Sequence, residues 1–203
     1  MADHVTSQQQ RPEAVGACRD RTIKLFRDPW ARLVAMNAPS LTDGPTGSPE
    51  FYASLPTIQV GSGCLFLDER RRLLLVKPAY KDPWEIPGGA VDAGESPLTA
   101  CIREIHEELG IDRAPIRLLC VDYRVPVEGV RGDALRFVFF GGVLSDEEAT
   151  RFVLDPSELL EWKFVEASDL DSYVTPVMAR RLRASLSSSE LAYLEEGWPP
   201  LPK

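Results

Sequence analysis

Three glutamates lie at helical spacing between residues 104 and 108. Glu104, Glu107 and Glu108 occupy positions i, i+3 and i+4, so a helix places their carboxylates on one face. Like charges at these spacings repel one another and cost a helix about 0.2–0.5 kcal/mol per pair. Carboxylate oxygens are the ligands that Mg²⁺ prefers, and a bound ion turns this repulsion into ligation. The pattern therefore indicates either a metal site or a solvated acidic face.

The residues around these glutamates favour the metal site. Arg103 lies four residues before Glu107 and can pair with its carboxylate. Gly88 and Gly89 end a predicted strand and allow its backbone to approach a ligand or metal closely. Glu95 follows six residues after Gly89, where the loop joins the helix.

The helix that carries the glutamates is predicted over residues 96–109. Ser96 is a favourable N-cap, Pro97 occupies the first helical position, and Gly110 is a typical C-terminal stop. Apolar residues at spacings of three and four form the opposite, core-facing side, namely Leu98, Cys101, Ile102, Ile105 and Leu109.

This segment resembles the Nudix box, G-x5-E-x7-R-E-U-x-E-E-x-G-U, in which U is a bulky aliphatic residue. All nine specified positions are filled, by Gly89, Glu95, Arg103, Glu104, Ile105, Glu107, Glu108, Gly110 and Ile111. The upstream hairpin and the segment WEIPGG (84–89) are also similar to the family. The resemblance covers about residues 57–170.

The resemblance implies an α/β fold, a Nudix α/β/α sandwich with a mixed β-sheet. It also implies an enzyme that hydrolyses a phosphoric anhydride (pyrophosphate) bond with Mg²⁺ or Mn²⁺. The implied metal ligands are the side chains of Glu104, Glu107 and Glu108 and the carbonyl of Gly89. Arg103 and Glu95 would orient them. The general base is expected to be Glu108 or an acidic residue outside the box, among Glu148, Asp155, Glu158 and Glu161.

The expected substrate is a nucleoside diphosphate linked to another moiety, such as ADP-ribose or a nucleoside triphosphate. Pro126 lies fifteen residues after Ile111 and resembles a marker of ADP-ribose pyrophosphatases, although a proline that ends a strand is the alternative. Trp84 and Tyr80 are candidates to stack on a base, and Lys77 is a candidate to contact phosphate. For these three residues, packing and solvation at a strand edge are the alternatives.

Two other functions stay open. The chain could be a Nudix-fold regulator that binds a nucleotide or metabolite without turnover, or a hydrolase of a non-nucleotide diphosphate. The intact box favours the enzyme, and the sequence shows no basic helix-turn-helix candidate. The short basic run ARRLRA (179–184) is interpreted as a solvated helix face.

Apolar patterns predict the elements that position these residues. Strands are expected over 58–68, 72–78, 116–127, 135–144 and 162–167, the first two forming a hairpin. A C-terminal helix is expected within 168–186, starting afresh near Pro176. The expected organisation is a disordered tail at 1–20, an extension or linker with a short helix at 21–56, a Nudix hydrolase domain at 57–186, and a C-terminal tail at 187–203.

Composition limits the partners. The 203 residues include 31 acidic and 23 basic side chains, for a net charge of −8, which disfavours binding of long nucleic acid. No apolar run is long enough to span a membrane, and the N-terminus has no apolar signal region. The four cysteines form no C-x-x-C pair, which favours a reducing cytoplasm. We expect a small-molecule substrate and leave a homodimer open.

Overall fold

The computed structural model describes residues 47–187 and 189–200. The tail predicted at 1–20 and the short helix predicted within 21–37 lie outside the described residues. The chain divides into two compact units, residues 1–55 and residues 56–203. In the first unit, helix α2 (Pro49–Ser54) begins where the Ser48 hydroxyl accepts a hydrogen bond from the N–H of Phe51.

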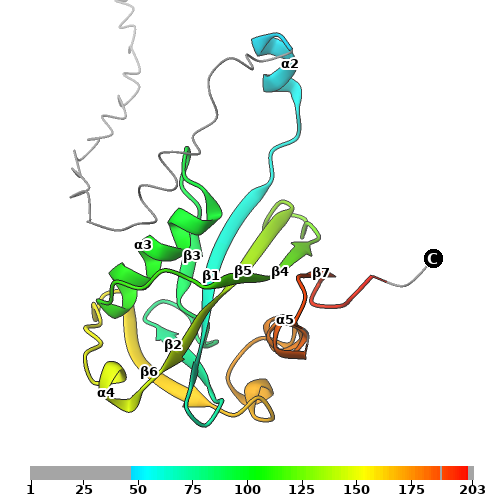
Figure 1. The fold of residues 1–203 in the computed structure, drawn as a ribbon. Coiled ribbons are helices and arrows are strands. Elements are labelled where there is room, and N and C mark those ends of the chain that lie inside the picture. Colours follow the sequence, from blue (N-terminus) through cyan, green and yellow to red (C-terminus); the bar gives the residue numbers. More distant parts are fainter. Residues whose placement is uncertain (1–46, 188, 201–203) are drawn as a thin grey trace, which may run out of the picture. The chain divides into compact units, whose positions relative to one another are not determined.

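The described part of the second unit is built on one mixed sheet of seven strands (Figure 1). The strand order is β6-β2-β1-β5-β4-β7, and β3 pairs with β1 beside β2. β1 runs parallel to β5, and β4 runs parallel to β7, whereas the other pairs are antiparallel. The strands are β1 (Gln59–Asp68), β2 (Leu73–Pro78), β3 (Gly88–Ala90), β4 (Arg117–Arg124), β5 (Ala134–Leu144), β6 (Leu159–Val165) and β7 (Ala192–Glu195).

Helices cover both faces of this sheet. Side chains alternate across a strand, so neighbouring residues of β1 enter different halves of the core. Phe66 packs in the cluster that includes Ile105 of one helix, whereas Leu65 packs in the cluster that includes Leu182 of another. Figure 1 shows these two helices, α3 and α5, on opposite sides of the sheet. The predicted α/β/α sandwich with a mixed sheet is confirmed. The helices of this unit are α3 (Pro97–Leu109), α4 (Asp146–Ala149), the 3₁₀ turn η1 (Leu170–Ser172) and α5 (Pro176–Ser187).

The predicted ends of the box helix are confirmed. The Ser96 hydroxyl accepts a hydrogen bond from the N–H of Thr99 at 3.1 Å, and Pro97 is the first residue of α3. Gly110 ends the helix with φ of +70°, a left-handed conformation that favours glycine. The fully buried side of α3 consists of Ala100, Cys101, Ile105 and Leu109.

The sequence-based prediction lacked four short elements of the described chain, namely α2, α4, η1 and β7. Helix α4 occupies the segment before β6, and β6 begins at Leu159 rather than at residue 162. Strand β7 lies within residues 187–203, where only a tail was expected, and pairs with β4 while burying Leu194. These missed elements are three to six residues long, too short for apolar periodicity to show. Among the described residues, no helix has the length and hydropathy needed to cross a membrane.

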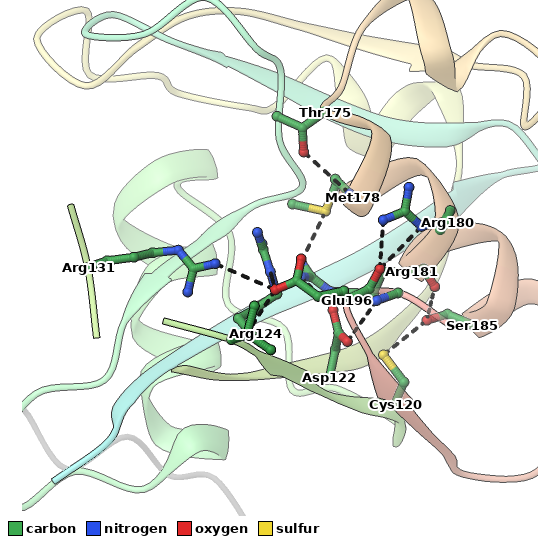
Figure 2. Close-up of polar contacts among 12 residues, drawn as sticks. Cys120, Asp122, Arg124, Arg131, Thr175, Met178, Arg180, Arg181, Ser185 and Glu196 are labelled. Carbon is green, nitrogen blue, oxygen red and sulfur yellow. Dashed lines mark hydrogen bonds and ion pairs between the residues drawn. The ribbon is translucent and has the colours of Figure 1, made fainter. Parts of the chain in front are cut away.

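The interpretation of the basic run on α5 as a solvated face is wrong. Arg181 is buried, and its Nε donates a hydrogen bond to Asp122 Oδ2 of β4 at 2.7 Å (Figure 2). Arg180 donates to the carbonyl of Glu196, just after β7. The run therefore fastens α5 to the sheet and to the C-terminal segment.

Candidate active site

The acidic residues of α3 lie against the two glycines of β3. The N–H of Gly88 donates a hydrogen bond to Glu108 Oε2 at 2.7 Å. A Cβ atom on Gly89 would stand 2.4 Å from Glu104 Oε1, so no side chain fits there unless that carboxylate moves. Gly88 has φ of +146°, and a Cβ there would stand 2.3 Å from the Ser62 carbonyl oxygen. The glycines thus allow close contact between β3 and the carboxylates.

Arg103 connects the other charged positions of the box. Its Nε and Nη2 donate to the two oxygens of Glu95, both at 3.0 Å, which is a bidentate arrangement. Its Nη1 donates to Glu104 Oε1 at 2.7 Å and to Glu107 Oε2 at 3.0 Å, and Nη2 also donates to the Ala90 carbonyl. The hydrogen bonds from Arg103 lower the pKa of Glu95 despite its partial burial. This guanidinium therefore joins the helix, the loop before it and β3.

Burial dominates the electrostatics of the two carboxylates beside β3. Burial raises the pKa of Glu104 above its usual value, although Arg103 opposes the shift. Burial also raises the pKa of Glu108 to about 8, against the hydrogen bond from Gly88, and the nearby charges of Glu104, Glu85 and Glu158 add to the rise. Negative charge is thus costly at this place unless a cation offsets it.

The donor set fits a hard divalent cation. In their present positions, no three His, Cys, Asp or Glu side chains of the described residues converge closely enough to hold a metal ion. One oxygen each of Glu104 and Glu107 is engaged by Arg103. The site nevertheless offers partly buried carboxylate oxygens beside a backbone that carries no side chain at Gly88 and Gly89. Oxygen donors of this kind suit Mg²⁺ and Mn²⁺.

The four acidic residues considered outside the box differ in their surroundings. Glu148 completes the capping box of α4, and Asp155 accepts a hydrogen bond from the N–H two residues further on. Glu161 is exposed on β6. The charge of Glu158, in contrast, raises the pKa of both Glu104 and Glu108. Of these four residues, Glu158 therefore has the clearest electrostatic effect on the box.

A cavity of about 450 Å³ opens beside the two glycines of β3. Tyr80 lines this cavity and is largely exposed. Trp84 does not line it, because its ring packs edge-to-face on Tyr173 with centroids 5.6 Å apart. Lys77, on β2, does not line it either, since its Nζ donates to the carbonyl oxygen of Asp82 in the segment after this strand. The structure thus brings one of the three predicted substrate contacts to the cavity.

Sequence reasoning missed three arginines that line the cavity. Arg124, Arg136 and Arg181 come from β4, β5 and α5. A signal for Arg136 exists in the sequence, because it is a charged residue between Ala134 and Val138, which both face the core. A single charged residue at a core-facing position of a strand is unusual and indicates a candidate functional residue.

Comparison with known proteins decides the family. Residues 57–185 match the family model described as NUDIX domain, which is more than half of the chain. The chain belongs to the Nudix family. Members of this family are pyrophosphohydrolases that act on phosphoric anhydride bonds.

Individual Nudix relatives are distant. A protein of Halorhodospira halophila named RNA pyrophosphohydrolase is 31% identical over 117 residues, which cover 51% of this chain and 64% of that protein. A putative 8-oxo-dGTP diphosphatase of Bacillus subtilis is 30% identical over 122 residues, covering 60% of this chain and 76% of that protein. The chain thus spans less than two thirds of the first of these relatives. The solved structure of a MutT NUDIX hydrolase from Burkholderia pseudomallei is 25% identical, with a TM-score of 0.53, and covers 66% of this chain and 100% of that one.

Proposed function

We propose that this Nudix chain is a metal-dependent pyrophosphohydrolase that cleaves a nucleoside diphosphate linked to another moiety. One observation carries the proposal. Glu104 and Glu108 are partly buried against Gly88 and Gly89, Arg103 holds the neighbouring carboxylates, and a cavity opens at the same place. A dense pyrophosphate anion needs such a site, because cations must offset its charge where water attacks.

Each box residue has a proposed role. The carboxylates of Glu104, Glu107 and Glu108 and the Gly89 carbonyl hold Mg²⁺ or Mn²⁺. When bound, such an ion screens the phosphate charge and makes the attacking water more acidic. Arg103 and Glu95 orient this set through their bidentate ion pair. Arg103 and Glu95 thus position the metal ligands and do not contact the reacting phosphorus.

We assign the role of general base, which accepts a proton from the attacking water, to Glu108. Its Oε2 is fixed by the Gly88 N–H at 2.7 Å, so the carboxylate has a defined direction relative to β3. Glu158 is the alternative base, because its charge acts on the same carboxylates. Glu158→Gln separates the two, because Glu108 is also a proposed metal ligand. If Glu158 is the base, this variant loses most of its kcat at saturating Mg²⁺, and if Glu108 is the base, it keeps most of it.

The substrate class includes nucleotide-sugars such as ADP-ribose and nucleoside triphosphates. The names of the two relatives, RNA pyrophosphohydrolase and putative 8-oxo-dGTP diphosphatase, add RNA and 8-oxo-dGTP as candidate substrates. A regulator that binds a nucleotide without turnover is the competing function. The buried free cysteines Cys64, Cys101 and Cys120 support a cytoplasmic location as part of the same proposal.

A product-release screen tests the function. The chain is incubated with NDP-sugars, nucleoside triphosphates, oxidised deoxynucleotides, 5′-triphosphorylated RNA and isoprenyl diphosphates, with Mg²⁺ and with EDTA. The proposal expects cleavage of a phosphoric anhydride bond in at least one nucleotide class, only with the metal. Saturable binding of a nucleotide without any cleavage would favour the regulator, and cleavage of isoprenyl diphosphates alone would favour the non-nucleotide hydrolase.

A further inference from the structure

One wall of the cavity beside the box is cationic, although the whole chain carries a net charge of −8. Two of its three arginines have carboxylate partners. Arg124 Nε donates to Glu196 Oε1 at 3.0 Å, and Arg181 Nε donates to Asp122 Oδ2 at 2.7 Å. Figure 2 shows both pairs where β4, α5 and the C-terminal segment meet. These two arginines are held in ion pairs and belong to the framework of the wall.

Arg136 differs from both of them. Within residues 47–187 and 189–200 its guanidinium makes no hydrogen bond and no ion pair. Its side chain is half-buried, and burial lowers its pKa, as do the positive charges of Arg181 and Arg124, whereas the negative charge of Glu85 opposes this shift. An arginine stays protonated at neutral pH even so. The chain thus keeps a partly desolvated positive charge beside Arg124 and Arg181 that has no ion-pair partner among the described residues. The charge of Glu85 offsets part of this cost, and an anion bound in the cavity would offset more.

Gly61 gives this guanidinium its position. In the sheet, Gly61 of β1 pairs with Arg136 on one side and with Ala90 of β3 on the other. A Cβ atom on Gly61 would stand 2.1 Å from Arg136 Nη1, so the guanidinium lies directly over this glycine. It therefore reaches across β1 and stands one strand away from β3, whose glycines contact the acidic residues of the box. Arg136 and Gly89, whose carbonyl is a candidate metal ligand, thus line one cavity, whereas the box carboxylates do not line it.

We propose that Arg136 is the anion anchor of the cavity and binds the phosphate of the half of the substrate that lies outside the metal-holding carboxylates. This inference rests on the proposed function and narrows its substrate class. Hydrolysis adds water across the P–O–P bridge: one P–O bond forms, the bridging P–O bond breaks, and a proton leaves. Whichever phosphorus is attacked, each half ends in a phosphate group. The half held by Arg136 leaves as a phosphomonoester, such as a nucleoside monophosphate.

A phosphate suits this position better than the edge of a neutral base. A guanidinium presents two parallel N–H donors that match two phosphate oxygens, and such pairs are strong because both partners are charged. A neutral base would leave the positive charge of the wall without compensation. Apolar residues also line the cavity, including Ile86, Val138 and Met178, and could contact the group attached to the phosphate.

Binding without metal tests the anchor independently of turnover. The full chain in EDTA is titrated with AMP, adenosine and inorganic phosphate and followed by amide NMR shifts. We expect AMP to bind at least about 10-fold more tightly than adenosine, with shifts at Gly61 and Ala90. Arg136→Met should remove this difference in affinity between AMP and adenosine, and Arg136→Lys should keep part of it. Arg70→Met removes one positive charge from the exposed turn after β1 and should change nothing.

Gly61→Ala is a second variant that keeps the arginine but pushes its guanidinium aside, and it should lose the same difference. In Mg²⁺, Arg136→Met should raise KM for a cleaved nucleotide by about 10-fold or more while kcat changes less. The inference is overturned if AMP and phosphate leave the cavity signals of the wild type unchanged, or if Arg136→Met binds AMP as the wild type does. A chain that binds AMP through Arg136 but cleaves no substrate would instead refute the proposed function alone.

Discussion

The buried ion pair between Asp122 and Arg181 offers a direct test of how the C-terminal part holds the sheet. Asp122 is completely buried on β4. Its Oδ2 accepts from Arg181 Nε at 2.7 Å, and its Oδ1 accepts from the N–H of Gly197 at 2.9 Å (Figure 2). One carboxylate thereby ties three segments together, namely the sheet, α5 and the residues after β7.

Arg181→Met removes one partner and leaves the Asp122 carboxylate buried with a single backbone donor. Removing one member of a buried pair typically costs about 3–5 kcal/mol in the free energy of unfolding, because the other charge stays uncompensated. We expect a loss of that size. Asp122→Leu should cost a similar amount. The double variant Asp122→Leu/Arg181→Met should recover most of the loss, since an apolar pair needs no partner.

Urea unfolding at pH 7, followed by circular dichroism, measures these free energies. Arg183→Met is the matched control on the same helix, because Arg183 pairs with the exposed Asp171, and it should cost less than about 1 kcal/mol. The reasoning is refuted if Arg181→Met also costs less than about 1 kcal/mol. It is equally refuted if the two single losses simply add in the double variant.

Three further outcomes follow from the same contacts. Burial alone would raise the pKa of Asp68, but hydrogen bonds from Arg72 hold it below its usual 3.8. Asp68→Asn should therefore cost about 2 kcal/mol at pH 7, and less as pH falls through the folded pKa below 3.8; urea unfolding at several pH values checks this, and an equal cost at every pH contradicts it. Gly89→Ala should push the Glu104 carboxylate away and lower kcat at least about 10-fold with little change in melting temperature; an unchanged kcat would speak against this close contact. Turnover should vanish in EDTA and return with Mg²⁺ or Mn²⁺, whereas full turnover in a verified metal-free sample would exclude the metal site.

The box helix was predictable because its signals are local. Ser96, Pro97 and Gly110 mark the two ends of α3 within the sequence itself, and the fixed spacing of the charged residues identifies the family. The core strands were predictable for the same reason, since their apolar runs are long enough to show. The α/β/α arrangement then followed from the family resemblance.

The cationic wall could not be predicted, because it depends on contacts between distant segments. Arg136 lies over Gly61 only because β5 pairs with β1 in parallel, and no local pattern announces that register. Asp122 and Gly197 are 75 residues apart in the chain, and their hydrogen bond forms only once β7 has joined the sheet. Arginine is mostly exposed in proteins, so Arg181 on an arginine-rich helix is predicted to lie at the surface unless its partner Asp122 is known.

The most direct test of the proposed hydrolase is kcat of Glu108→Gln at saturating Mg²⁺, measured on a nucleotide that the wild type cleaves. Glutamine keeps the size and helix propensity of the side chain and can still accept the hydrogen bond from Gly88, so the melting temperature should stay the same or rise slightly. His106→Gln, on the exposed side of the same helix, is the control and should change kcat little. The account predicts a loss of at least about 10²-fold in kcat for Glu108→Gln. A variant that retained most of its kcat would contradict it.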